Sequence, residues 1–396
     1  MLGVLGGGQL GLMFSLSAKR MGFKTTVVDP DPDAPAFSIA DRKIIGSYSD
    51  PELLADLTAS CHAVTTEFEN VPADSLAVLE QALTVRPSSH SVATCQDRIL
   101  EKSFLRDNGF PTAPFLTLPG ESSPADFKLH PLLPGILKAS REGYDGKGQW
   151  SVSSYEELSR ILINTTGPFV LEKRLDLQAE YSIVLARSHD GEMAFYPVAE
   201  NIHESGILHI SAVPADIPLE LSELIKKTAA NIANRLDYVG VLSVEFFLGK
   251  EGGLYVNELA PRPHNSGHYT IDACQSSQFD QHVRVLTGIP LARTDLLSPC
   301  AMGNLLGHLW TDHSPPNLQG ILEHPSAKLY LYGKKHARPG RKMGHFTVFG
   351  THVTEAKLHA RNLLSRLSGN PMNHESPDFQ FTASRKNNLS PPAEKT

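Results

Sequence analysis

The stretch Gly253-Leu-Tyr-Val-Asn-Glu-Leu-Ala-Pro-Arg-Pro-His-Asn-Ser-Gly-His268 joins a predicted strand to a loop crowded with polar side chains. Its apolar start is typical of a strand that enters a site. The twelve residues 257–268 hold one carboxylate, one arginine, two histidines, two asparagines and one serine, stiffened by two prolines and a glycine. A metal-type ligand, an anion-binding arginine and proton-handling imidazoles thus occur together. We expect a metal-bound nucleotide to meet an anionic substrate here.

A second acidic residue lies on the strand that precedes this stretch. Glu245 interrupts the apolar run 240–248, and Glu258 follows it by thirteen residues at the end of the next strand. Carboxylates at equivalent depth on paired strands can share Mg²⁺, which prefers a few carboxylates together with phosphate oxygens. An ion pair with Arg262 would also offset the cost of burying a glutamate, so both interpretations stay open.

A lysine and a glycine-rich segment suggest where phosphates bind. Lys138 ends the predicted strand 135–138, and Gly143-Tyr-Asp-Gly-Lys-Gly148 follows shortly after it. An ammonium group beside a flexible loop of backbone N–H groups suits a triphosphate. The spacing is not that of a P-loop. A plain hairpin turn is the alternative interpretation of the glycines.

The amino terminus carries a different nucleotide signature. Gly6-Gly-Gly-Gln-Leu-Gly11 follows the predicted strand 2–5 and opens a helix, and Asp29 ends the second strand. This matches the dinucleotide fingerprint in spacing and context. However, any doubly wound sheet needs glycine at this turn, and the acidic, proline-rich run 29–33 suits a ribose poorly. An NAD-dependent dehydrogenase is therefore a remote alternative, because nothing downstream is arranged for hydride transfer.

The amino-acid composition limits the kinds of protein to which this chain can belong. The 396 residues are 41% hydrophobic and 20% charged, with a net charge of −7, as in an ordinary multidomain soluble enzyme without nucleic acid as a general partner. The cysteines at 61, 95, 274 and 300 are scattered, and we find neither a signal peptide nor a bilayer-spanning run. We therefore expect a cytoplasmic protein that binds no membrane. Residues 328–345 contain six basic and no acidic residues, which indicates a site for a small phosphate or else a solvated loop.

The order of predicted elements divides the chain into three regions. Strands and helices alternate over the first hundred residues, which predicts a parallel, doubly wound sheet. A break at Arg86-Pro-Ser-Ser89 ends this region. Strands around 169–172, 181–187, 194–198, 241–248 and 254–258 predict an antiparallel or mixed sheet, and residues 302–350 predict a small β-rich part.

Taken together, these motifs resemble the ATP-grasp superfamily of carboxylate–amine ligases. Within it, the chain resembles the family of 5-(carboxyamino)imidazole ribonucleotide synthases of purine biosynthesis. The resemblance runs in order from Leu2 to about Gly350. Its supports are Gly6-Gly-Gly-Gln-Leu-Gly11, Glu67-Phe-Glu-Asn-Val-Pro72, Glu142-Gly-Tyr-Asp-Gly-Lys-Gly-Gln149, Asn201-Ile-His-Glu-Ser-Gly-Ile-Leu208, the stretch 257–268 and Arg338-Pro-Gly-Arg-Lys-Met-Gly-His345.

The resemblance implies a mixed α/β and α+β architecture of three domains. A doubly wound domain would cover residues 1–95, and the ATP-grasp domain would cover 96–298 with a lid at about 112–190. A small β-rich domain would cover 299–369. Residues 370–396 are polar and rich in proline, asparagine and serine, which predicts a disordered tail.

The resemblance also implies the reaction. An ATP-dependent carbon–nitrogen ligase would activate bicarbonate as carboxyphosphate and transfer the carboxyl group to the exocyclic amine of 5-aminoimidazole ribonucleotide. Mg²⁺ would be the cofactor, without NAD or biotin, and the partners would be these small molecules and a second copy of the chain in a homodimer.

Individual roles follow from the same resemblance. The residues that would bind ATP are Arg98, Lys138, Gly143, Gly146, Gly148, Glu172, Lys173, Leu175, Glu180, His203, Asn257 and Glu258. Those that would bind the metal are Glu245 and Glu258. The catalytic candidates at bicarbonate and the amine are Tyr144, Asp145, Lys147, Arg262 and His264. Those that would bind the ribonucleotide are Gln9, Glu67, Asn265, Ser266, Lys335, Arg341 and Lys342. His264 could orient a substrate, transfer a proton or only fix the loop.

Some features differ from the common pattern, and other functions remain possible. Ala260 stands where many ATP-grasp proteins have asparagine, and Lys147 where relatives also have arginine. A formate-dependent glycinamide ribonucleotide transformylase shares Pro-Arg-Pro-His, but we would expect Asp-Thr-Gly in place of Asn265-Ser-Gly267. Another ATP-grasp ligase, a biotin carboxylase-like subunit and a regulatory module without catalysis are further alternatives. The intact acidic and basic candidates argue against the last of these.

Overall fold

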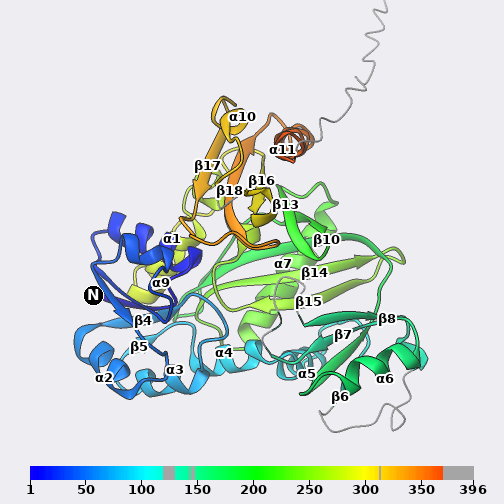
Figure 1. Cartoon of the computed structure of the whole chain (residues 1–396), viewed down its shortest axis with the longest axis horizontal. Helices are drawn as coiled ribbons and strands as arrows, with labels where there is room; N and C mark the ends of the chain where they lie inside the picture. Colours follow the sequence, from blue (N-terminus) through cyan, green and yellow to red (C-terminus); the bar gives the residue numbers. More distant parts are fainter. Residues whose placement is uncertain (119–129, 142, 144–147, 312–313, 369–396) are drawn as a thin grey trace, which may run out of the picture.

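The computed structural model describes residues 1–118, 130–141, 143, 148–311 and 314–368. The predicted site residues Tyr144, Asp145, Gly146 and Lys147, and the predicted tail 370–396, lie outside the described residues. Figure 1 shows three groups of elements around the long strands β10, β14 and β15. Among the helices described, none is long and apolar enough to cross a membrane.

The N-terminal part is a parallel sheet with strand order β3-β2-β1-β4-β5, as the alternating pattern predicts. Its central strand β1 is fully buried, because helices cover both faces. The carboxyl ends of β1 and β4, which are neighbours in the sheet, are followed by the glycine turn and by Glu67. The elements are β1 Leu2–Leu5, α1 Gln9–Arg20, β2 Thr25–Asp29, β3 Arg42–Ile45, α2 Pro51–Ser60, β4 Ala63–Thr66, α3 Ala73–Glu80, β5 Thr84–Val85 and α4 Ser89–Gln96.

A second, smaller sheet follows in the chain. It is antiparallel, with strand order β6-β9-β7-β8, and α6 packs on it. Leu137, Leu158 and Leu171 share its separate hydrophobic core. The elements are α5 Arg98–Asp107, β6 Phe115–Leu118, β7 Gly135–Ala139, β8 Gln149–Val152, α6 Tyr155–Ile163 and β9 Phe169–Lys173.

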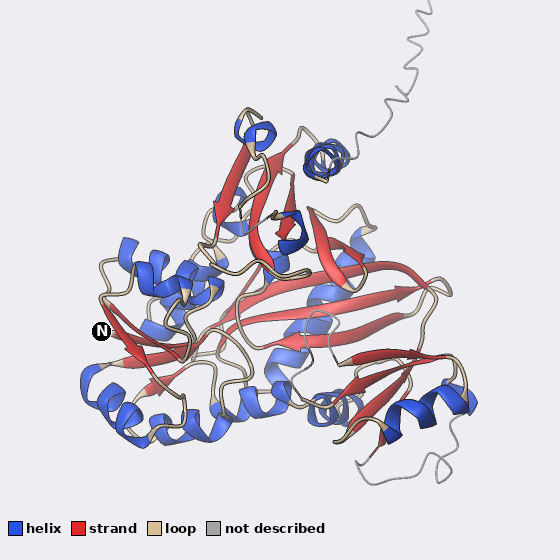
Figure 2. Cartoon of the chain, viewed as in Figure 1, coloured by secondary structure: helices blue, strands red, loops and turns tan. Residues whose placement is uncertain are grey.

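The third sheet is the largest and extends beyond the central part of the chain. Its strand order is β15-β14-β10-β12-β13-β16-β18-β17, with β11 paired to β10, so the C-terminal strands continue the sheet through the β13–β16 pair. The strands, red in Figure 2, are β10 Leu177–Arg187, β11 Met193–Phe195, β12 Ala199–Glu204, β13 Ile207–Val213, β14 Gly240–Gly249, β15 Leu254–Ala260, β16 Cys300–Leu306, β17 Ala327–Leu331 and β18 Lys342–Phe349. The helices are α7 Leu219–Arg235, α8 Thr270–Ala273, α9 Gln278–Thr287, α10 Gln319–Leu322 and α11 Val353–Leu367.

Strand β14 turns one apolar face toward helix α7 and carries Glu245 on its other face. Leu242, Val244 and Phe246 pack with helix α7 in a buried core, whereas Glu245 points to the opposite side. This follows from the two-residue period of a strand. The alternation therefore turns the acidic residue of an apolar strand away from α7 and toward the functional face.

Helix α9 packs between the central sheet and the N-terminal domain. Phe279 and Val283 join the same core as Phe14 of α1. Ser277 begins the helix with a capping box, in which Asp280 accepts a hydrogen bond from the Ser277 backbone. Since α9 follows the loop 261–268 closely, this docking brings that loop next to the glycine turn of the first domain.

Candidate functional site

A large cavity, with a volume of about 1080 Å³, lies where the three sheets meet. The N-terminal domain contributes the ends of β1 and β4, and the small sheet contributes β7 and β9. The wall is completed by strands β10, β12, β14 and β15, the turn from β12 into β13, and the segment between β17 and β18. The sequence-predicted residues along it are Gln9, Glu67, Arg98, Lys138, Glu172, Lys173, Leu175, Glu180, His203, Glu245, Asn257, Glu258, Arg262, His264, Asn265, Arg341 and Lys342.

The two predicted metal carboxylates are direct partners across two strands. Glu245 of β14 pairs with Glu258 of β15, and the register then shifts so that Phe246 pairs with Val256. Asn257 is therefore the extra residue of a β-bulge, a device that re-aims side chains. The bulge explains how Asn257 and Glu258, although adjacent in sequence, both line the cavity.

The chemistry of this acidic pair fits a divalent cation. Burial and the charge of Glu258 raise the pKa of Glu245 to about 7, which reflects two carboxylates held close together. The buried Oδ1 atom of Asn257 has no hydrogen-bond partner within the described part of the chain. No cluster of three or more acidic, histidine or cysteine ligands occurs among the described residues. Two carboxylates and an amide oxygen would suit Mg²⁺, which keeps few protein ligands and takes phosphate oxygens or water for the rest.

Three charged groups are buried together where the small sheet meets helix α5. The Nζ atom of Lys138 lies 3.0 Å from Oε1 of Glu172, and the Nζ atom of Lys102 lies 3.4 Å from Oε2 of the same residue. Burial raises the pKa of Glu172, but the two lysines lower it more, to about 2. Burial also lowers the pKa of Lys138 despite the nearby carboxylate. The Glu172 side chain is thus bound to lysines, while the segment 172–175 lines the cavity.

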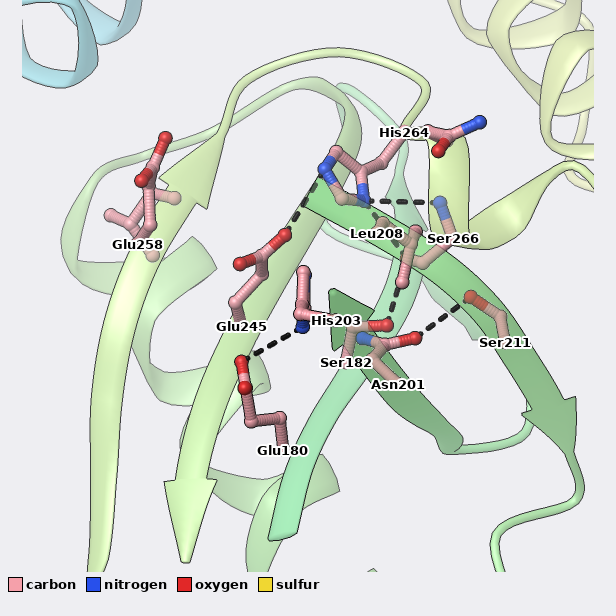
Figure 3. Close-up of polar contacts among 12 residues, drawn as sticks. Glu180, Ser182, Asn201, His203, Leu208, Ser211, Glu245, Glu258, His264 and Ser266 are labelled. Carbon is pink, nitrogen blue, oxygen red and sulfur yellow. Dashed lines mark hydrogen bonds and ion pairs between the residues drawn. The ribbon is translucent and has the colours of Figure 1, made fainter. Parts of the chain in front are cut away.

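Two further predicted nucleotide residues contact each other, as Figure 3 shows. The Nδ1 atom of His203 on β12 lies 3.0 Å from a carboxylate oxygen of Glu180 on β10. Burial lowers the pKa of His203, but its hydrogen bond to Glu180 raises it above the ordinary value. Arg98, at the start of α5, forms an ion pair of 3.2 Å with Glu258 and donates to the carbonyl of Gly143. The other described glycine of that predicted loop, Gly148, has a φ of +65° in the turn before β8.

His264 joins the acidic pair to the loop behind it (Figure 3). Its Nε2 atom lies 3.1 Å from Oε1 of Glu245, and its Nδ1 atom lies 2.8 Å from Oγ of Ser266. Ser182 in turn donates to Ser266, whose backbone N–H also points at Nδ1. Because an N–H group can only donate, Nδ1 accepts and Nε2 carries the proton toward Glu245. Burial, Arg262 and Lys342 hold the pKa of His264 well below its usual range, so the ring is neutral.

The glycine turn at the amino terminus is occupied by the protein's own carboxylates. Glu67 accepts hydrogen bonds from the backbone of Gly8 (2.8 Å) and Gly11 (2.6 Å), and Asp29 accepts one from Gly7 (2.7 Å). A Cβ atom at Gly8 would lie 2.1 Å from Oε1 of Glu67, which explains the glycine there. These N–H groups are the ones that a pyrophosphate would need. The dehydrogenase hypothesis therefore loses its anion site.

The basic segment contributes only part of its predicted set to the cavity. Arg341 and Lys342 line it, together with Lys334 and Arg338, which we did not select from the sequence. Lys335 forms an ion pair with Asp33 and is absent from the described lining. Ser266 is likewise behind the wall, since it is buried and bonded to Ser182 and His264.

Several partner residues were missed from the sequence. Glu69 binds the guanidinium group of Arg262, and Lys102 reaches Glu172 from helix α5. Asn304 of β16 exchanges two amide hydrogen bonds with Asn265, at 3.0 and 2.6 Å. Only Glu69 had a local signal, as the second carboxylate of Glu67-Phe-Glu-Asn-Val-Pro72.

Comparison with known proteins gives one consistent family. Residues 1–96 match the ribonucleotide synthetase preATP-grasp domain, residues 103–279 the ATP-grasp domain, and residues 300–358 the phosphoribosylaminoimidazole carboxylase C-terminal domain. The N5-carboxyaminoimidazole ribonucleotide synthase of Brucella melitensis is 41% identical over 87% of this chain and 95% of its own. That of Bacillus subtilis is 40% identical over 87% and 90%.

Solved structures agree with this assignment. The ADP complex of an N5-carboxyaminoimidazole ribonucleotide synthetase is 38% identical, with a TM-score of 0.85 over 94% of this chain and 97% of that one. The Aspergillus clavatus enzyme in complex with ADP and 5-aminoimidazole ribonucleotide is 31% identical, also with a TM-score of 0.85, over 93% and 98%. The expected three-domain ATP-grasp architecture is therefore confirmed.

Proposed function

This chain belongs to the N5-carboxyaminoimidazole ribonucleotide synthase family of ATP-grasp ligases, and on that premise we propose that it carboxylates 5-aminoimidazole ribonucleotide with ATP and bicarbonate. The observation that carries the proposal is the cavity of about 1080 Å³, which runs from the Glu245–Glu258 pair to the basic segment 334–342. A metal nucleotide and a phosphorylated substrate can thus meet in one cavity.

The proposed reaction has two steps. A bicarbonate oxygen attacks the γ-phosphorus of ATP and expels ADP, which leaves carboxyphosphate. The exocyclic amine of the ribonucleotide then captures the carboxyl carbon, or CO₂ released from carboxyphosphate, with loss of inorganic phosphate and a proton. Phosphoryl transfer of this kind depends on positioning and charge neutralisation more than on covalent help from the protein.

The nucleotide side of the cavity would bind ATP. Lys138 and Arg98 present positive charge to phosphates, and the segment 172–175 would hold the adenine. Glu180 would bind the ribose, with His203 fixing its carboxylate at 3.0 Å. Glu245 and Glu258 would hold Mg²⁺, with the free Oδ1 of Asn257 beside them. When bound, the ion supplies charge neutralisation at the phosphates.

The opposite side would bind bicarbonate and the ribonucleotide. Arg262 and Asn265 line the cavity next to the glycine turn, and Arg341 and Lys342 would clamp the ribonucleotide phosphate. The neutral His264, which donates to Glu245, would orient the acidic pair and leave no basic nitrogen for proton abstraction. Tyr144, Asp145 and Lys147 stay predictions for the reacting groups.

One coupled assay tests the function. ADP release should require bicarbonate and be strongly stimulated by 5-aminoimidazole ribonucleotide, with one phosphate released per carboxylated product. Stimulation by glycinamide ribonucleotide with formate, and none by 5-aminoimidazole ribonucleotide, would instead identify the transformylase. A protein that binds NADH and no ATP would overturn the ligase altogether.

Assembly and domain limits complete the proposal. A homodimer and a cytoplasmic site of action are proposed from the family relationship. We also propose the domain limits 1–95, 96–298 and 299–369, although strands β13 and β16 pair across the last of them. Sedimentation at micromolar concentration tests the dimer.

A further inference from the structure

Lys102 is a fully buried lysine on the inner face of helix α5, and the proposed reaction gives it no role. Its side chain has no exposed surface. The Nζ atom lies 2.9 Å from the carbonyl oxygen of Asn257 and 3.4 Å from Oε2 of Glu172. An ammonium group is costly to bury, so the two contacts that hold it need an explanation.

The first contact belongs to a group of three between α5 and strand β15. Lys102 donates to the carbonyl of Asn257, Arg98 pairs with the carboxylate of Glu258, and Glu101 accepts a 2.6 Å hydrogen bond from the backbone N–H of Leu259. Residues spaced by three and four lie on one face of a helix. Since β15 is at the edge of its sheet, Lys102 and Glu101 bind backbone groups that another strand would otherwise pair, whereas Arg98 binds a side chain.

The second contact joins Lys102 to the small sheet. Glu172 of β9 receives Lys102 at one oxygen and Lys138 of β7 at the other. Two ammonium groups and one carboxylate leave a net charge of +1 in this buried trio. Without Lys102, the carboxylate of Glu172 would pair with Lys138 only and would neutralise its ammonium group. A phosphate that binds at Lys138 would then meet less positive charge.

We propose that Lys102 is a positioning residue of the nucleotide site: anchored on the Asn257 carbonyl, it shares Glu172 with Lys138 and so keeps the Lys138 ammonium group available to phosphate oxygens. Lys102 itself is buried behind the wall and is absent from the described lining of the cavity. The inference rests on the proposed ATP site and adds a residue that acts through another one.

The test compares Lys102→Met, which removes the charge and keeps an unbranched side chain, with Leu105→Ala in the same helix. Leu105 is also fully buried but packs in the apolar core. Lys102→Met is expected to raise the Kd for Mg²⁺-free ADP and the KM for ATP by about tenfold, the effect of one lost charge-assisted contact. The KM for the ribonucleotide should stay unchanged. Leu105→Ala should lower the melting temperature without changing either nucleotide constant.

A double variant separates positioning from a merely structural role. Glu172→Gln combined with Lys102→Met frees Lys138 from its carboxylate, so this protein should bind ADP more tightly than Lys102→Met alone. If the Lys102→Met variant fails to fold, the double variant is compared with the Glu172→Gln variant instead. Because Lys102 acts through Glu172 in this proposal, its removal should have little further effect once Glu172 is neutral. The Kd values of these two variants for ADP should then agree within about twofold.

Two results would overturn the inference. One is a folded Lys102→Met protein with the wild-type Kd for ADP, and the other is a Leu105→Ala protein with the same nucleotide defect. The binding measurement needs no turnover, so a wild-type protein that binds ADP without carboxylating the ribonucleotide would reject only the proposed reaction.

Discussion

Arg262 and Glu69 form a two-point ion pair that joins the loop after β15 to the loop after β4. The Nε and Nη2 atoms of the arginine lie 2.5 and 3.2 Å from the two carboxylate oxygens. Burial raises the pKa of Glu69, but the guanidinium group lowers it more, so the carboxylate is ionised. Arg262 also donates from Nη1 to the carbonyl of Pro263, at 3.2 Å. These contacts fix the planar guanidinium group at the cavity wall, where its positive charge lies beside the space that an anion would enter.

Glu69→Gln should therefore impair the substrate side of the cavity. An amide cannot accept both N–H groups of the fork, so we expect the KM for bicarbonate or for the ribonucleotide to rise by about tenfold. The KM for ATP should not change. Steady-state kinetics with each substrate varied in turn measures this, and Asp74→Asn, an exposed charge removal on the adjacent helix α3, is the matched control. An equal increase in all three constants would reject the positioning of Arg262.

The acidic pair makes a prediction about the metal. Glu258→Gln should reduce kcat by about 100-fold or more, because charge neutralisation by a metal contributes several kcal/mol to phosphoryl transfer. Titration with Mg²⁺ should show a weaker apparent affinity. Glu251→Gln, in the exposed turn between β14 and β15, removes the same charge nearby and should leave activity intact. Retained turnover in Glu258→Gln would contradict the assigned role.

The fold was predictable where local patterns repeat. The alternation of strands and helices over the first hundred residues predicted the parallel sheet, and the apolar run around Glu245 predicted β14. Even the pairing of Glu245 with Glu258 followed from two adjacent strands at equal depth. In each case the signal lies within a few residues of the chain, where backbone periodicity acts.

The rest of the site depends on contacts between distant residues. Lys102 meets the Asn257 carbonyl, Glu69 meets Arg262, and Asn304 meets Asn265. A lysine, a glutamate or an asparagine is by itself typical of a surface, so nothing local distinguishes these. The continuation of the large sheet into β16 was missed for the same reason, because strand pairing across domains leaves no periodic signal.

The basic segment offers a matched pair of lysines. Lys342 lines the cavity, whereas Lys335 is bound to Asp33 outside its described lining. Lys342→Met should raise the KM for the ribonucleotide by about tenfold, through loss of a charged phosphate contact, and Lys335→Met by much less. Kinetics at saturating ATP and bicarbonate give the comparison. A larger increase in KM for Lys335→Met would show that the ribonucleotide phosphate binds outside this cavity.

The docking of α9 on the first domain predicts a pH-dependent stability. Asp280 is buried and accepts hydrogen bonds from Ser17 (2.7 Å) and the Ser277 backbone (3.0 Å), and it pairs with Arg20. Burial raises the pKa of Asp280, but these contacts lower it more, so it falls below its ordinary value of 3.8. The unfolded chain therefore takes up the proton at a higher pH than the folded chain does. The stabilisation by Asp280 is then complete above pH 3.8 and is lost as the pH falls through the lower, folded value.

Asp280→Asn should accordingly lower the free energy of unfolding at neutral pH by about 2 kcal/mol, the typical contribution of hydrogen bonds to a charged group. The deficit should shrink as the pH falls below 3.8, because the carboxylate is then protonated first in the unfolded wild-type chain and, at lower pH, in the folded chain as well. Urea midpoints followed by circular dichroism between neutral pH and pH 3 measure the difference. Asp216→Asn, an exposed residue before α7, should show no deficit at any pH. A deficit of constant size across the range would mean that the side chain acts by packing, since packing does not depend on the proton.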